Sequence, residues 1–366
     1  MPKTLHSTKH FHLVKQLRPL IAKMNPGDPI PTQQKLKKQF SVSQNTIELA
    51  LARLRREGLI ERPAGKQRLV KSEICDPADH YVAIIRPDWP SSVIEGISQS
   101  IVDAGHAANW RFDITNYRSH AGLDLEKAMG DNDAAVLMLT TEVVPDHLRD
   151  ALTYMRKPLV LAQDQIEGLE LNTVCTDDGL SIQQAVEHLG ELGHRRIGIL
   201  LPTLTTAPMV QALDGYKRTM HALGVTDTEF EPWIVACENK PFTRSIDIAY
   251  PVFKQWLERN HQQVTAMVCA NMDMGMVVNR CVHEMGLAIP QQFSVVSSDN
   301  IAKMGEYFYP PATTTEMDLS MYGKAVIELL QKQFDDEQAM PECRYIPSFL
   351  IQRKTSGPVP ATAVVA

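Results

Sequence analysis

Apolar runs of strand type alternate with helical patterns along most of this chain, and this alternation limits the folds that it can adopt. Strands that alternate with helices pair in parallel, because each helix returns the chain to the same edge of the sheet. The rhythm restarts after residue 194, which predicts an α/β fold with two lobes. The strand-type runs are YVAIIR (81–86), WRFDIT (110–115), AAVLMLT (134–140), PLVLA (158–162), RRIGILLP (195–202), AMVCAN (266–271) and FSVVSSDN (293–300).

The first 71 residues differ from the rest in charge. They carry 15 Lys and Arg against four acidic residues, an excess of 11 positive charges, whereas the remainder of the 366-residue chain has an excess of 17 negative charges. Such asymmetry is typical of a small basic module that binds a polyanion and is joined to an acidic module that does not. Residues 72–79, SEICDPAD, are predicted to be the linker between them.

The basic segment predicts three helices and a hairpin. A first helix of about a dozen residues carries apolar side chains at helical spacing and stops at the turn cluster 25–29. Thr32 is placed to cap a short second helix, and Ser43 to cap a third that ends at Glu57-Gly58. Residues 59–70 then predict a β-hairpin with a basic tip, which completes a winged helix-turn-helix.

This pattern predicts a DNA interface. The second helix of a helix-turn-helix, which is the third predicted helix here, enters the major groove, and a basic wing reaches phosphates or the minor groove. The residues so placed are Asn45, Thr46, Arg62, Lys66 and Arg68. The alternative is that the basic winged helix mediates protein contacts.

The run PGDPIPTQQKLKKQFSVSQNTIELALARLRREGLIERPAGKQRLV resembles the winged-helix domain of GntR-type bacterial transcription regulators, over about residues 10–71. The resemblance implies DNA binding through the starts of the second and third predicted helices, and this adds Thr32, Gln33, Gln34, Ser43 and Gln44 to the interface. The family carries arginines in its "PSER" and "SRNTVR" segments, where this chain has Gln34, Gln44 and Glu48. Because glutamine suits adenine edges, the departure predicts an altered operator.

The acidic part resembles a second family. TVCTDDGLSIQQAVEHLGELGHRRIGILLP, TAMVCANMDMGMVVNRCVHEMGLAIPQQFSVVSSDN, PPATTTEMDLSMYGKAVIELL and PSFLIQRKTSG are similar, in order and spacing, to the effector domain of LacI/GalR repressors. That domain is similar to periplasmic sugar-binding proteins. A GntR-like head on a LacI-like body is the arrangement of arabinose-type repressors, which the chain resembles overall.

These resemblances imply an N-terminal winged helix-turn-helix and a two-lobed, periplasmic-binding-protein-like α/β sensor domain. The expected domains are the head at 1–71, the linker at 72–79, the sensor at 80–356 and a flexible tail at 357–366. Within the sensor we expect lobe 1 at about 80–170 and 301–325, and lobe 2 at about 171–300 and 326–356.

In the LacI family the ligand lies between the lobes, at strand ends. Asn271 matches the Asn of the family's "AND" motif, and Asp299 matches the carboxylate of "GFDD", which suits the vicinal hydroxyls of a sugar. Met272, Ala212 and Gln163 replace charged residues of the family, so a more apolar, aromatic or amide-bearing effector is the alternative to a sugar. Trp89 and Phe242 are candidate aromatic platforms, although a loop tryptophan is as often a packing residue. The full set of predicted effector residues is Asp88, Trp89, Ser91, Gln163, Asp164, Phe242, Asn271, Asp273 and Asp299.

Other chemistries find little support in the sequence. No P-loop, G-x-G-x-x-G, G-x-S-x-G or H-E-x-x-H motif occurs, so we expect neither an enzyme nor a cofactor. His188 and His194 lack a metal-ligand spacing, and the methionines 267, 272, 274 and 276 are expected in the core. The six cysteines form no Cys-x-x-Cys pair, which indicates reduced thiols.

We therefore predict a ligand-responsive DNA-binding regulator, a repressor of a catabolic operon. Its partners would be double-stranded operator DNA, a small polar effector such as a sugar, and a second copy in a C2 homodimer. The start of the chain lacks the apolar core of an export signal, which predicts a cytoplasmic protein that does not bind membranes. The alternative is a cytoplasmic solute-binding or enzyme-like α/β protein whose basic head mediates protein contacts.

Overall fold

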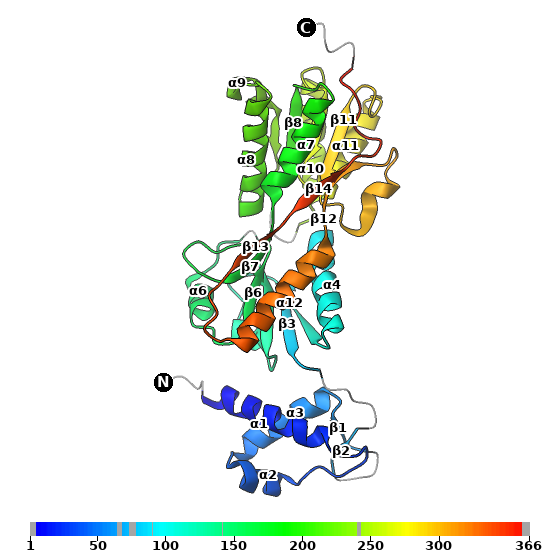
Figure 1. Cartoon of the computed structure of the whole chain (residues 1–366). Coiled ribbons are helices and arrows are strands. Elements are labelled where there is room, and N and C mark those ends of the chain that lie inside the picture. Colours follow the sequence, from blue (N-terminus) through cyan, green and yellow to red (C-terminus); the bar gives the residue numbers. More distant parts are fainter. Residues whose placement is uncertain are drawn as a thin grey trace. The chain divides into compact units, whose positions relative to one another are not determined.

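The computed structural model describes residues 5–63, 68–72, 78–89, 91–140, 142–239 and 243–360 (Figure 1). The chain forms two compact units. The first consists of the N-terminal residues up to Tyr81 with the short segments Ala108–Arg111 and Gly130–Asp133, and the second contains the remainder. Below, "head" means the described residues up to Lys71, and "sensor" means those from Tyr81 to Pro360.

The head is a winged helix-turn-helix, as predicted. Its apolar core is built from Leu13, Leu17, Leu36, Ile47 and Leu54, each at most 2% exposed. The first helix spans 18 residues and is therefore longer than the dozen predicted from its apolar spacing. The helices are α1 (Leu5–Ala22), α2 (Gln33–Phe40) and α3 (Gln44–Arg56), and the antiparallel wing strands are β1 (Ile60–Glu61) and β2 (Val70–Lys71).

Lobe 1 of the sensor contains a six-stranded sheet in the order β13-β7-β6-β5-β3-β4. Parallel pairing joins β3 to β5, β5 to β6, β6 to β7 and β7 to β13, as expected for crossover connections. The strands are β3 (Tyr81–Pro87), β4 (Arg111–Tyr117), β5 (Ala134–Met138), β6 (Leu159–Ala162), β7 (Asn172–Thr176) and β13 (Cys343–Ile346), and the helices are α4 (Ser92–Ala107), α5 (Leu125–Met129), α6 (Asp146–Thr153) and α12 (Leu319–Asp335).

Lobe 2 repeats this plan with the order β14-β12-β11-β10-β8-β9, in which only β14 pairs antiparallel among the described ladders. Its strands are β8 (Ile197–Leu201), β9 (Ile234–Ala236), β10 (Ala266–Cys269), β11 (Ser294–Ser298), β12 (Thr313–Met317) and β14 (Ser348–Ile351). Its helices are α7 (Asp178–Glu191), α8 (Ala207–Ala222), α9 (Asp227–Phe230), η1 (Glu231–Trp233), α10 (Ser245–Asn260), α11 (Met272–Glu284) and η2 (Ile301–Tyr307).

The sheets divide the chain differently from the predicted lobe boundaries. Residues 172–176 form β7 of lobe 1, 301–317 lie in lobe 2, and 326–346 return to lobe 1. β13 carries no apolar run, since only Ile346 of Cys343–Ile346 is buried. Apolar runs did not reveal β7 or β12 either, because these strands bury hydroxyl-bearing residues such as Thr173 and Thr313. Their hydroxyls form internal hydrogen bonds, so burial does not leave them unsatisfied.

The described part of the predicted tail is held against lobe 2. Gly357 donates its N–H to Ser294 Oγ at 3.1 Å, and Val359 donates its N–H to the Leu192 carbonyl at 3.0 Å. Residues 361–366 lie outside the described residues. The chain is therefore anchored to lobe 2 at least as far as Val359.

Close backbone packing fixes the start of α7 against α8. A Cβ added at Gly215 would lie 2.4 Å from the carbonyl oxygen of Gly179, a separation that no side chain tolerates. Glycine therefore allows the two helices to approach at this point. The approach matters because α7 begins one residue earlier, at Asp178.

Candidate functional site

The start of α3 presents exposed polar side chains from a well-defined helix cap. Ser43 is extended, and its Oγ accepts a hydrogen bond from the Thr46 N–H at 3.2 Å, as predicted for an N-cap. The next two side chains, Gln44 and Asn45, are exposed in the first turn. This is the part of a recognition helix that meets base edges.

A second polar side chain reaches α3 from the start of α2. Thr32 caps α2, and Gln33 and Gln34 follow it on the surface. Gln44 Nε2 donates to Gln33 Oε1 at 2.6 Å and to Glu48 Oε1 at 2.9 Å. Both amide hydrogens of Gln44 are thus engaged, and its Oε1 keeps its acceptor capacity. A bidentate contact to adenine would require one of these hydrogen bonds to open.

The other predicted DNA contacts differ in their exposure. Thr46 is only 2% exposed, and its Oγ1 lies 2.7 Å from Ser43 Oγ, so its side chain supports the cap and presents no surface to a base. Arg62 and Arg68 are exposed on either side of the wing tip. Lys66, at the tip, lies outside the described residues.

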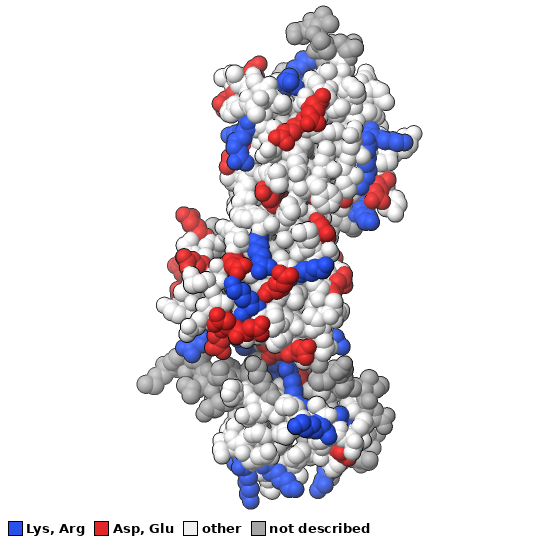
Figure 2. Space-filling view, viewed as in Figure 1, with Lys and Arg blue, Asp and Glu red and all other residues white. Residues whose placement is uncertain are grey.

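The surface charges follow the split seen in the sequence. On the face shown in Figure 2, Lys and Arg dominate the head, whereas the sensor carries charges of both signs. A cationic head is the requirement for phosphate contacts, because affinity for DNA comes largely from counterion release.

In the sensor, two carboxylates from different strand ends come close together. Asp178 begins α7 directly after β7, and Asp299 directly follows β11. Burial, with the nearby charge of Asp178 as a second cause, raises the pKa of Asp299 to about 8. Burial also raises the pKa of Asp178, and the Thr176 hydroxyl, which donates to Oδ2 at 2.5 Å, opposes this shift. Neither carboxylate forms an ion pair with a Lys, Arg or His of the described residues.

A tyrosine from α12 lies near Asp178: burial raises the pKa of Tyr322, and the charge of Asp178 adds to this shift. Tyr322 is fully buried, donates its hydroxyl to the Val174 carbonyl at 2.6 Å and accepts the N–H of Gln163 at 2.8 Å. Gln163 and Asp299 have left-handed backbones, with φ of 77° and 58°. Non-glycine residues of this kind are held by their surroundings and concentrate at binding sites.

Buried hydroxyls hold the two carboxylate-bearing segments together. Ser181 Oγ lies 2.6 Å from Thr315 Oγ1 and donates to Ser298 Oγ at 3.2 Å. Thr315 also donates to Ser298, at 3.0 Å. The cluster ties α7 to β11 and β12, so Asp178 and Asp299 have a fixed spacing. We call Asp178, Asp299 and Tyr322 with this hydroxyl cluster the carboxylate site.

Three further predicted residues lie near strand ends in settings of their own. Asn271 caps α11, because its Oδ1 accepts the Met274 N–H at 3.0 Å. Burial raises the pKa of Asp273, with the charge of Arg244 acting against the shift. Burial also raises the pKa of Asp164, whose Oδ1 accepts the Gln165 N–H.

The residues after β3 lie in a different setting. Asp88 is exposed and pairs with Arg118 at 3.2 Å, an ion pair that solvent screens. Ser91 accepts the Ile94 N–H at 3.4 Å at the start of α4, and Trp89 is partly buried. Phe242 lies outside the described residues. Their roles as ligand contacts stay predictions.

The histidines and methionines have structural positions. His194 lies 2.7 Å from Thr265 Oγ1 and 3.0 Å from the Gly357 carbonyl, and His188 lies 2.8 Å from Ser356 Oγ. Met267, Met272 and Met274 are buried, and Met276 is partly buried.

Among the described residues, no three potential ligands gather into a metal site. No helix in this part of the chain has the length and apolarity to cross a membrane.

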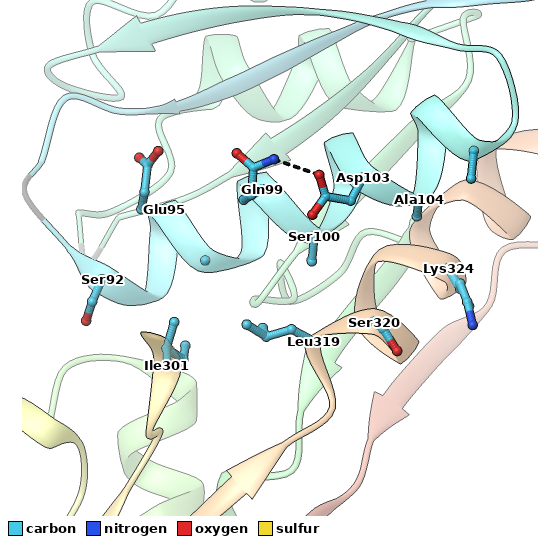
Figure 3. Close-up of a pocket in the computed structure, with 12 residues that line it drawn as sticks. Ser92, Glu95, Gln99, Ser100, Asp103, Ala104, Ile301, Leu319, Ser320 and Lys324 are labelled. Carbon is cyan, nitrogen blue, oxygen red and sulfur yellow. Dashed lines mark hydrogen bonds between the residues drawn. The ribbon is translucent and has the colours of Figure 1, made fainter. Parts of the chain in front are cut away.

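A cavity of about 740 Å³ lies elsewhere in the sensor, between α4 and the start of α12 (Figure 3). Ile301 and Leu319 form part of its apolar wall, and Glu95, Asp103 and Lys324 also line it. None of the predicted effector residues that the structure describes lines this cavity.

Sequence reasoning missed five members of the carboxylate site, namely Asp178, Ser181, Ser298, Thr315 and Tyr322. For Asp178 a signal existed, because Asp177-Asp178-Gly179 follows TVCT as polar residues do at the carboxyl end of a strand. No local signal marks Tyr322, which reaches the site from a helix about 140 residues further along the chain than β7.

The chain matches known families in two places. Residues 12–70 match the family "Bacterial regulatory proteins, gntR family", and residues 186–356 match "Periplasmic binding protein-like domain". The transcriptional repressor PurR of Vibrio atlanticus is 30% identical over 173 residues, which cover 47% of this chain and 48% of the relative. The match thus spans about half of that relative. PurR of Proteus mirabilis is 25% identical over 72% of this chain and 75% of its own length.

Solved structures show the same fold. The transcriptional regulator CelR in complex with cellobiose has a TM-score of 0.66 at 21% identity, covering 86% of this chain and 92% of CelR. A LacI family regulator from Enterococcus faecium with bound ribose has a TM-score of 0.64 at 21% identity, covering 76% of this chain and 99% of the regulator.

Proposed function

Since the chain joins a GntR-family winged helix to a periplasmic-binding-protein-like domain of the kind found in LacI-family regulators, we propose that it is a ligand-responsive transcriptional regulator. It would bind operator DNA through the head and a small molecule through the sensor. Because its relatives include repressors, we propose repression as its action, in the cytoplasm where operator DNA lies.

The exposed helix starts and the basic charge of the head support the DNA-binding role. Gln44 and Asn45 are presented by a capped helix, and Arg62 and Arg68 flank the wing. Phosphate contacts would supply affinity, and the glutamine and asparagine side chains would supply sequence preference.

The carboxylate site carries the sensing role. Asp178 and Asp299 lie close together without a cationic partner among the described residues, so each ionised carboxylate lacks a compensating charge. A ligand with several hydroxyl or ammonium donors would satisfy both. We therefore propose a polyhydroxylated or amine-bearing effector, and cellobiose and ribose, which neighbouring structures contain, are reasonable first compounds to test.

The response would be a linkage between two equilibria. In a C2 dimer, each protomer would place one α3 on a half-site, and a change in the sensor would alter the affinity of the pair for DNA. Such coupling typically changes affinity by about 5- to 150-fold.

Two measurements test the proposal. A thermal-shift screen of sugars, polyols and amines should identify a compound that raises the melting temperature of the full chain, because it binds only the folded state. Fluorescence anisotropy with a DNA duplex across a salt series should give a steep log-log slope. A flat slope would contradict the DNA-binding role. If no donor-rich compound stabilises wild type more than Asp299→Asn, the sensing role is wrong.

A further inference from the structure

A buried ion network joins the recognition helix to the segment that leads into β5. Arg53 of α3 donates through Nε to Glu57 Oε1 at 2.7 Å and through Nη2 to Asp133 Oδ2 at 3.1 Å. Arg18 of α1 holds Glu57 in a two-point contact, at 3.1 and 2.8 Å. The guanidinium carbons of both arginines lie over the Tyr81 ring, 5.2 and 5.4 Å from its centroid. All five residues belong to the first unit.

The network is largely buried, and its described members carry charges of both signs. The side chains of Arg53 and Glu57 are fully buried, that of Asp133 is 8% exposed and that of Arg18 is 14% exposed. Among the described residues, two arginines and two carboxylates compensate each other, and the aromatic face adds cation-π contacts. Burying charge is costly, and breaking such a pair costs much more than losing a surface ion pair. A network of this kind therefore tolerates few alternative arrangements.

Asp133 also belongs to the framework of lobe 1. Its Oδ2 accepts the Tyr81 N–H at 2.9 Å, and its own N–H donates to the Tyr81 carbonyl at 2.7 Å. Tyr81 is the first residue of β3, and Asp133 immediately precedes β5. These two strands are neighbours in the sheet. One carboxylate thus bonds both the recognition helix and the amino-terminal ends of two central strands.

We propose that the Arg18, Arg53, Glu57 and Asp133 network transmits the state of the sensor to the recognition helix. This inference rests on the proposed function and adds the path by which the sensor would affect DNA binding. A shift of β3 or β5 would move the Asp133 carboxylate, and the Arg53 side chain, which has no solvent to replace that partner, would follow. Because coupling between sites is reciprocal, DNA bound to the head must then change the local stability of β5.

The test uses DNA as the probe and requires no effector. Hydrogen exchange of the full chain is followed by mass spectrometry for peptides covering residues 134–138, with and without a mixed-sequence duplex of about 30 base pairs at low salt. In wild type, DNA should change the exchange rate of these peptides by about fivefold or more. In Asp133→Asn, which keeps an acceptor for the Tyr81 N–H, the change should fall to less than about twofold while DNA still binds.

Matched variants separate coupling from folding. Asp150→Asn removes the same charge from an exposed position on α6 and should behave as wild type. Asp133→Glu restores the charge and should recover part of the response. If Asp133→Asn proves unfolded by its melting curve, Arg18→Gln at the rim of the network replaces it and should reduce the response in the same way.

Two results would overturn the inference. One is DNA binding by wild type with no change of exchange in 134–138. The other is a DNA-dependent change of exchange in 134–138 that is as large as in wild type in both single variants, Asp133→Asn and Arg18→Gln, when these are folded. Failure of wild type to bind DNA at all would instead reject the proposed function, and the route with it, so anisotropy on the same samples tells the two failures apart.

Discussion

The head and the sensor both bury charged side chains, but the charges are compensated differently. In the first unit, Arg53 and Glu57 lie without solvent in a network in which each charge has a partner of opposite sign. In the sensor, Asp178 and Asp299 lie close enough for their charges to interact, and the described residues form no ion pair with either. Paired buried charges hold one arrangement, whereas like charges raise the free energy of the folded state until something relieves them. The first environment suits a rigid connection and the second suits a site that a ligand completes.

Breaking the compensated network should give the largest effect. Arg53→Ala leaves Glu57 buried without one of its partners, and we expect a loss of about 3–5 kcal/mol in the unfolding free energy of the head. Hydrogen exchange of α3 amides measures it. Arg55→Ala, two residues along on the exposed face, should cost less than about 0.5 kcal/mol. If Arg53→Ala and Arg55→Ala lose the same unfolding free energy, the buried network does not stabilise the head more than a surface charge does.

Removing one of the uncompensated carboxylates should affect binding and leave the fold intact. Asp299→Ala should weaken binding of the compound found by the thermal-shift screen by about 2–3 kcal/mol, because a charged acceptor is lost. Calorimetric titration measures this loss, and operator affinity should stay near wild type. Asp214→Ala, an exposed residue on α8, is the matched control. Unchanged effector affinity with a lowered melting temperature would instead assign Asp299 a structural role.

In the head, base recognition should be separable from phosphate contact. Gln44→Ala should relax preference at one operator position by about 1–2 kcal/mol, because a single amide contact to a base is lost. Arg62→Ala should weaken binding to all DNA sequences alike, and it should reduce the slope of log affinity against log salt concentration by about one. Selection from a random duplex library distinguishes the variants. If both relax the same position, the assignment of Gln44 to bases and Arg62 to phosphates is wrong.

The ligand-free sensor should also show a pH dependence. A carboxyl whose pKa rises on folding, to about 8 for Asp299, contributes stability that is complete below its unfolded pKa of about 3.9 and lost as pH rises through 8. The melting temperature of wild type relative to Asp299→Asn should therefore fall between about pH 4 and pH 8. A bound donor-rich effector should flatten this trend, since it stabilises the ionised form. A difference that is constant with pH would show that Asp299 is not buried with an elevated pKa.

The predictions from sequence succeeded where structure is local. The caps at Thr32 and Ser43 and the glycine after α3 each depend on a few neighbouring residues, and all three occur as predicted. Long apolar runs such as β5 and β10 were likewise found, because full burial leaves a clear signal in composition. The lobe boundaries failed because β7 and β12 contain buried polar residues, whose burial depends on partners that only the folded chain supplies, and because β13 is largely exposed and has no apolar run.

The winged helix, the α/β class of the sensor and the unequal charge of the two regions could be predicted from the amino-acid sequence, since periodicity, capping and composition are properties of neighbouring residues. Which charged groups meet depends on how the folded elements pack. Asp133 reaches Arg53 across 80 positions, and Asp299 reaches Asp178 from the end of another strand. Neither meeting has a local signature. The parallel sheets bring Asp178 and Asp299 together from strand ends that are far apart in the chain, and packing of a helix onto the segment before β5 brings Arg53 to Asp133. The fold thus compensates one set of charges and leaves the other without a partner of opposite sign among the described residues.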